Sequence, residues 1–119
     1  MSVIRVNYLT DFHYGEPAVL LALDHPGVEE FSAVLRHADA NGESTLRHDA
    51  VTHEFRIEPD AAVIELTQNL VVWRLDRAKV NEIAEYLDTL HNPGSGHHYV
   101  DIVSPAETLV LSCNEYIGN

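Results

Sequence analysis

The chain has 119 residues, of which 45% are hydrophobic and 22% are charged, so its composition predicts one globular domain and excludes collagen-like, coiled-coil and fully disordered chains. Nineteen acidic residues outnumber seven basic ones, which gives a formal charge of −12. A surface of this sign repels nucleic acid and anionic membranes and favours a basic protein partner.

Three absences bear on where the protein works. No apolar stretch approaches the roughly 20 residues that span a bilayer. The first residues show no basic segment followed by an apolar one, so no secretory signal is visible. Cys113 is the single cysteine, which leaves no internal disulfide and no cysteine-based zinc site. We therefore expect a cytoplasmic protein in which Cys113 is a small buried residue rather than a nucleophile.

The first elements follow from hydrophobic patterning. Residues 3–9 alternate between apolar and polar side chains, which predicts a strand, and a loop is expected at 11–17. The continuous apolar run 18–23 predicts a strand that is buried on both faces. A helix then begins near Asp24, with Pro and Glu residues suited to its first turn, and ends near Gly42.

The rest of the chain predicts six strands and a second helix. Asp76 is the expected N-cap of that helix, and the Pro- and Gly-rich segment 92–96 ends it. Trp73 shares a strand face with apolar neighbours and is expected in the core. The predicted strands are 45–51, 52–58, 62–67, 70–75, 97–103 and 108–112.

These elements predict an α+β fold in which two amphipathic helices pack on one face of a mainly antiparallel sheet. The pattern of residues 23–35 recurs at 75–87 with an offset of 52, which suggests a tandem ββαββ repeat with halves 1–58 and 59–119 inside one domain. Chance similarity between two capped amphipathic helices is the alternative.

Eight histidines raise the question of a metal or an acid–base site. His48 and His53 would meet across a tight hairpin, where a neighbouring carboxylate could support general base catalysis. His97 and Asp101 share a strand face but lie roughly 13 Å apart at strand rise, too far for one ion without another ligand. The candidate metal ligands are His48, His53, His91, His97 and Asp101, and no cofactor is otherwise implied.

Aromatic and acidic residues in the predicted loop, near the C-terminus and on polar strand faces are candidates for contact with a partner. The interface candidates are Asp11, Phe12, Tyr14, Glu54, Glu58, Glu115 and Tyr116.

Motifs for phosphate cradles, zinc proteases and serine hydrolases are absent, so we expect a protein without catalysis. Our first hypothesis is a small acidic protein-binding module, most concretely an inhibitor or immunity protein that occupies a basic partner such as a toxic nuclease. One alternative is a small histidine-rich enzyme or a ligand- or metal-binding protein. The other is a structural homo-oligomer without catalysis, for example a homodimer in which edge strands such as 3–9 or 108–112 pair across a two-fold axis.

Overall fold

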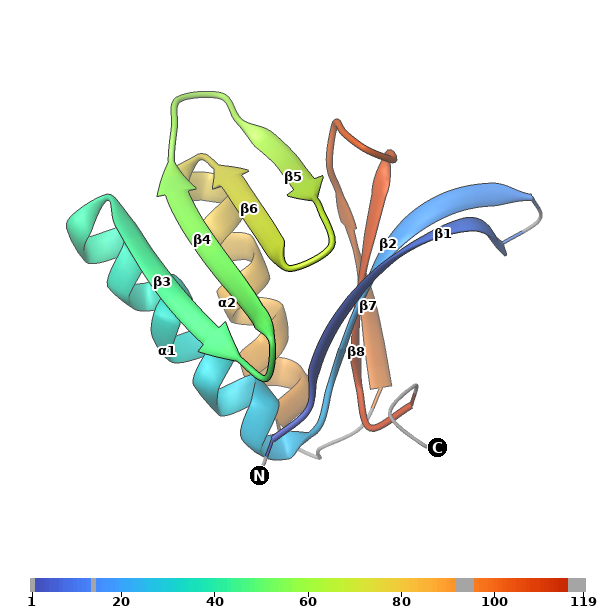
Figure 1. Cartoon of the computed structure of the whole chain (residues 1–119), viewed down its shortest axis with the longest axis horizontal. Coiled ribbons are helices and arrows are strands. Elements are labelled where there is room, and N and C mark those ends of the chain that lie inside the picture. Colours follow the sequence, from blue (N-terminus) through green and yellow to red (C-terminus); the bar gives the residue numbers. More distant parts are fainter. Residues whose placement is uncertain (1, 14, 92–95, 116–119) are drawn as a thin grey trace.

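The computed structural model describes residues 2–13, 15–91 and 96–115, and its elements form two four-stranded sheets and two helices (Figure 1). The elements, in chain order, are β1 (Ile4–His13), β2 (Glu16–Leu23), α1 (His25–Asn41), β3 (Glu43–His48), β4 (Val51–Ile57), β5 (Ala62–Leu66), β6 (Leu70–Leu75), α2 (Arg77–His91), β7 (Gly96–Asp101) and β8 (Thr108–Cys113).

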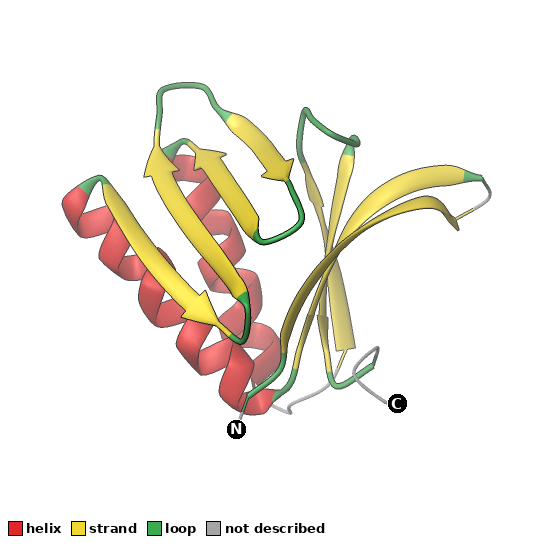
Figure 2. Ribbon diagram, viewed as in Figure 1, coloured by secondary structure: helices red, strands yellow, loops and turns green. Residues whose placement is uncertain are grey.

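The expected α+β class is confirmed, with the strands divided between two sheets. The first sheet has the order β1-β2-β8-β7, and the second has the order β3-β4-β6-β5. In each sheet the central pair, β2 with β8 or β4 with β6, is parallel. The flanking pairs are antiparallel. Figure 2 shows the two helices side by side against the second sheet, with the first sheet standing beside it.

The strand order is that of two ββαββ halves whose hairpins are exchanged. Each sheet takes one hairpin from each half, so neither half contains a complete sheet. The pairs Leu23–Cys113 and Leu75–Ile57 hold equivalent places in the two sheets. Leu23 and Leu75 keep the offset of 52, whereas Ile57 and Cys113 do not. The repeat pattern is therefore interrupted by insertions in the second half.

The start of α1 is fixed to the start of β1. Asp24 caps the helix, because its Oδ1 accepts hydrogen bonds from the backbone N of Gly27 at 2.7 Å and of Val3 at 2.9 Å. A Cβ on Gly27 would lie 2.1 Å from the carbonyl oxygen of Val3, so only glycine allows this approach. Asp76 caps α2 as expected and accepts from the backbone N of Lys79 at 2.7 Å.

An aromatic cluster lies between α1 and the second sheet. Trp73 and Phe55 are stacked at 5.7 Å, and the ring of Phe31 from α1 meets both edge-on at 5.2 Å. Trp73 is fully buried, which confirms its assignment to the core. Cys113 is buried as well.

Two predictions about strands were wrong. The expected loop 11–17 is mostly strand, because β1 continues to His13 and β2 begins at Glu16, which makes a long curved arm (Figure 1). The segment 108–112 is not an edge strand, because β8 lies between β2 and β7 and its side chains are buried on both faces. The strand β1 is at an edge, as expected. Within the described residues, neither helix is long and apolar enough to cross a membrane.

Candidate functional site

The first sheet has a second apolar cluster on the face turned away from the main core. Successive side chains of a strand point to opposite faces, so β2 presents Ala18, Leu20 and Ala22 to this side. These residues are buried together with Val110 of β8. Leu9 and Phe12 of β1 pack against the same cluster from the arm, so this sheet face is apolar at its centre.

A hollow of about 280 Å³ opens on this face near the arm. Tyr99 stands opposite Val110, and Asp101 stands opposite Thr108, in the pairing of β7 with β8. Tyr99 is 53% exposed, so its ring is available to a partner. We call this site the arm hollow; it is lined by Phe12, Glu16, Pro17, Ala18, Tyr99, Asp101 and Thr108.

The charge of the arm hollow has one sign. Glu16 and Asp101 line it. A neighbouring hollow, which shares Glu16 and Thr108 with it, adds a third carboxylate, Glu107, and is also lined by Val103, which is 71% exposed. No lysine or arginine of the described chain lines either hollow. None of the ion pairs found among these described residues involves the three carboxylates. Their charge is therefore not neutralised by any ion pair within the described part of the chain.

The outer face of the second sheet is different, because its charges pair with one another. Arg56 contacts Glu54 at 2.9 Å, and Arg74 bridges Glu58 and Glu65. The hydrogen bonds that the Arg74 guanidinium donates to Glu58 and Glu65 raise its pKa. The interface candidates Glu54 and Glu58 thus have internal partners and lie on a polar, solvated face.

The remaining interface candidates do not converge on one surface. Asp11 and Phe12 lie near the tip of the arm, and only Phe12 lines the hollow. Glu115 follows β8 at the opposite end of the sheet, where it contacts His97 Nδ1 at 2.9 Å and accepts a hydrogen bond from Ser112 Oγ at 3.2 Å. Two further candidates, Tyr14 and Tyr116, lie outside the described residues.

Sequence reasoning missed Tyr99, Glu16 and Thr108 as parts of one site. Alternation along 97–101 does place Tyr99 on one face with His97 and Asp101. The missing information was the parallel pairing of β2 with β8, which aligns Leu20 with Val110 and sets the arm beside β7 and β8. Long-range pairing of this kind leaves no local signal in the sequence.

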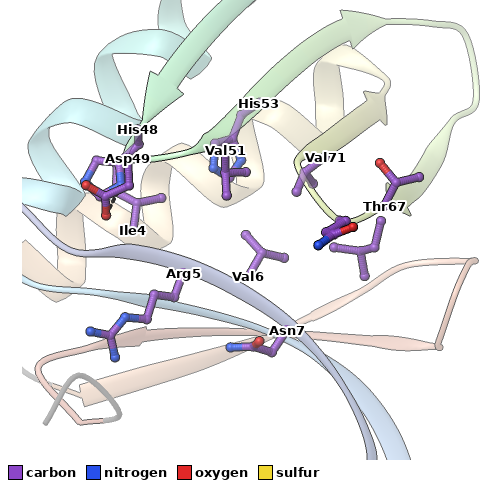
Figure 3. A pocket seen from close by; sticks show the side chains of 12 residues that line it. Ile4, Arg5, Val6, Asn7, His48, Asp49, Val51, His53, Thr67 and Val71 are labelled. Atoms are coloured by element: carbon purple, nitrogen blue, oxygen red, sulfur yellow. Dashed lines mark ion pairs between the residues drawn. The ribbon is translucent and has the colours of Figure 1, made fainter. Parts of the chain in front are cut away.

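A second cavity, of about 310 Å³, lies between β1 and the turns of the second sheet (Figure 3). One wall is β1, and the other is formed by the β3–β4 and β5–β6 hairpins. We call it the His53 cleft; it is lined by Ile4, Arg5, Val6, Asn7, His48, Asp49, Val51, His53, Leu66, Thr67, Gln68 and Val71.

His53 is the buried polar group of this cleft, with 1% of its surface exposed. Its Nδ1 accepts a hydrogen bond from the indole Nε1 of Trp73 at 3.3 Å, so the neutral ring carries its proton on Nε2. Burial, and secondly the nearby charge of His48, lowers the pKa of His53 to about 4. The imidazole is therefore neutral at physiological pH.

His48 joins the N-terminal segment to the β3–β4 hairpin. Its Nε2 lies 3.0 Å from both the Oγ and the carbonyl oxygen of Ser2, and its Nδ1 lies 3.5 Å from Asp49 Oδ2. Asp49, His48 and Ser2 are thus in the same order as the acid, the base and the nucleophile of a serine hydrolase. The Ser2 hydroxyl, however, donates to Glu30 at 2.9 Å, and the Ser2 carbonyl oxygen accepts the Nε2 proton. His48 thus acts as a tether rather than a base.

The candidate metal ligands are divided between the two sheets. His48 and His53 line the His53 cleft, and His97 and Asp101 lie on β7 of the first sheet. The side chain of His91 lies outside the described residues. In the part of the chain that the structure describes, no group of three or more His, Cys, Asp or Glu side chains is arranged to hold a metal ion.

Comparison of the chain with protein-family models, with curated proteins and with solved structures found no match.

Proposed function

We propose that the protein is a binding module that occupies a basic protein partner, and that the arm hollow is its contact surface. The observation that carries this proposal is the exposed ring of Tyr99 beside a hollow whose only charged groups in the described chain are carboxylates. Tyrosine is enriched among the residues that dominate binding energy at protein interfaces.

The chemistry of the arm hollow fits an arginine or lysine side chain. A guanidinium group stacks favourably on the face of a tyrosine ring, and Asp101 and Glu16 line the same hollow as Tyr99. Ala18 lines the hollow and is buried with Val110 in the apolar cluster of this sheet, so packed side chains lie behind it. A partner side chain would thus meet aromatic and anionic groups that are already in place.

The charge of the whole molecule supports the same class of partner. Most of its cations are paired with its own acids, so the excess of twelve negative charges is left on the surface. Such a surface speeds encounter with a basic protein and makes binding sensitive to salt. The cations in ion pairs are Arg36, Arg56, Arg74, Arg77 and Lys79.

The most concrete form of the proposal is an inhibitor or immunity protein of a toxic nuclease. A nuclease presents lysine and arginine side chains to the phosphates of its substrate. Carboxylates on a rigid sheet can take the place of those phosphates. The protein would then act by occupying the nuclease, without chemistry of its own.

The experiment is a parallel capture from a lysate of the cells that express this chain, with three tagged proteins. The first is the natural chain, and the second carries Tyr99→Ala and Asp101→Asn. The third is a matched control, Tyr8→Ala with Asp60→Asn, because Tyr8 is also exposed and Asp60 has a positive φ that asparagine tolerates.

We expect the natural chain and the control to retain the same basic protein in low salt and to release it in high salt. The hollow variant should not retain it. The proposal is wrong if the hollow variant retains the same protein as the natural chain, or if none of the proteins retained by the natural chain is basic and salt-sensitive.

A further inference from the structure

We propose that the His53 cleft binds a small uncharged molecule that has an apolar body and one hydrogen-bond acceptor, such as a ketone or amide oxygen. This site is separate from the arm hollow, and its occupancy does not depend on the proposed protein partner.

The size and walls of the cleft fit such a ligand. A volume of about 310 Å³ lies at the lower end of the range for small-molecule sites. Val51 and Val71 belong to the second-sheet wall, and Ile4 and Val6 extend from β1 toward that wall (Figure 3). The side chain of Arg5 extends to the opposite side of β1 (Figure 3). The cleft is therefore lined by both polar and apolar side chains, and the apolar ones come from both walls.

The cleft contains one buried polar group for recognition. The bond from Trp73 occupies His53 Nδ1 and leaves the proton on Nε2. None of the hydrogen bonds found among the described side chains uses Nε2. Ser32 Oγ is the only fully buried side-chain N or O atom of the described chain that has no hydrogen-bond partner. Since His53 Nε2 also has no partner and is not among such atoms, it is accessible from outside, and the ring lines the cleft. A donor of this kind specifies an acceptor on the ligand.

The surroundings favour a neutral acceptor over a charged one. Arg5 and Asp49 line the cleft with opposite charges, so its lining has no excess of either sign, and the net charge of the chain repels anions. A cation would find no acceptor at His53, because the only free ring nitrogen carries a proton. The other histidine, His48, is held by Ser2 and does not compete.

The pseudo-symmetry of the fold relates the cleft to an equivalent place at which the two sheets are joined. In the second sheet, β5 takes the place that β1 has in the first. There the two sheets are joined by a bridge between Val63 and Ser104, with the backbone N of Ile64 donating to the carbonyl oxygen of Ser104 at 2.9 Å. Between β1 and the β3–β4 turn there is a cavity in the equivalent place, and the ligand would fill it.

The test uses two matched probes, acetophenone and ethylbenzene, which have similar size and differ in the carbonyl oxygen. Each is titrated into the isotope-labelled full chain, and methyl and imidazole NMR signals are followed. We expect acetophenone to shift the methyl signals of Val51, Leu66 and Val71 together with the Nε2 signal of His53. It should bind about tenfold more tightly than ethylbenzene, because it alone accepts the hydrogen bond.

Two variants and a control complete the test. His53→Phe removes the donor and should abolish the preference for the ketone. Val51→Phe should fill the cleft and abolish binding of both probes, even if His53→Phe does not fold. Val103→Phe, at a 71% exposed position outside the cleft, should bind as the natural chain does. Equal binding of the two probes, shifts at other sites, or undiminished binding to Val51→Phe would overturn the proposal.

Discussion

Acidification should lower the free energy of unfolding of the protein through the protonation of His53. The pKa of this histidine is lowered from 6.5 to about 4 in the folded chain, whereas in the unfolded chain it keeps the ordinary value. The folded state therefore binds its proton less readily than the unfolded state. The contribution of His53 to the free energy of unfolding is fully present above pH 6.5 and is lost as the pH falls toward 4.

The linkage relation gives the magnitude. With these two pKa values, the free energy of unfolding falls by about 2 kcal/mol between pH 7 and pH 5, and by about 3 kcal/mol at pH 4. The effect of His53 must be separated from the other effects of acid on the chain by a variant that has no titrating group at this position. His53→Asn places an amide oxygen near Nδ1, where it can accept from Trp73, and has no titrating group.

The assay is urea denaturation of both proteins at pH 7, 6, 5 and 4, followed by tryptophan fluorescence. Trp73 is the only tryptophan and is buried, so its emission reports unfolding. We expect the natural chain to lose about 2 kcal/mol more than His53→Asn between pH 7 and pH 5. Parallel pH profiles for the two proteins, or an NMR titration of His53 near pH 6.5, would refute the reasoning.

Three further outcomes follow from the core and the helix start. Gly27→Ala should lower the free energy of unfolding, because the added Cβ would collide with the Val3 carbonyl oxygen. The loss in a urea titration should be about 2 kcal/mol or more, as for other substitutions that overpack a buried site. An unchanged midpoint would contradict the tight contact. Trp73→Ala should cost about 3–5 kcal/mol by thermal unfolding monitored by circular dichroism, and a loss under 1 kcal/mol would remove it from the core. Burial, with Asp24 and Glu115 nearby, raises the pKa of the Cys113 thiol, so a thiol reagent should modify it only after denaturant is added; rapid labelling of the native chain would contradict its burial.

Local signals in the sequence were sufficient for most of the elements. Asp24 and Asp76 mark the two helix starts, since both cap in the structure. The continuous apolar run 18–23 predicts a strand that is buried on both faces, and it is buried throughout. The core position of Trp73 followed from its apolar neighbours.

The division into two sheets had no local signal. It depends on the parallel pairing of β2 with β8, whose paired residues are separated by most of the chain. The loop expected at 11–17 failed for a related reason: a polar, aromatic segment continues as strand when an antiparallel neighbour pairs with it, as His13 pairs with Glu16. Tertiary pairing overrides strand propensity in such segments.

The candidate sites depended even more on long-range contacts. The hairpin between His48 and His53 was expected, and both histidines do line one cleft. The bond from Trp73 to His53 was not expected, because cross-strand neighbours on the sheet must be known first. Tyr99 likewise gains its place beside Phe12 only from the order of strands in the first sheet.

The most direct test of the proposed function is a chemical-shift titration of the full chain with N-acetyl-arginine amide and, in parallel, with N-acetyl-citrulline amide, a neutral analogue of the same shape. We expect the arginine probe to shift the backbone signals of Phe12, Tyr99 and Thr108 and the ring signals of the two aromatic residues in low salt. The citrulline probe should leave these signals unchanged. Equal effects of the two probes, or shifts spread over the carboxylates of the whole surface without a maximum at Tyr99, would contradict the arm hollow as a site for a basic partner.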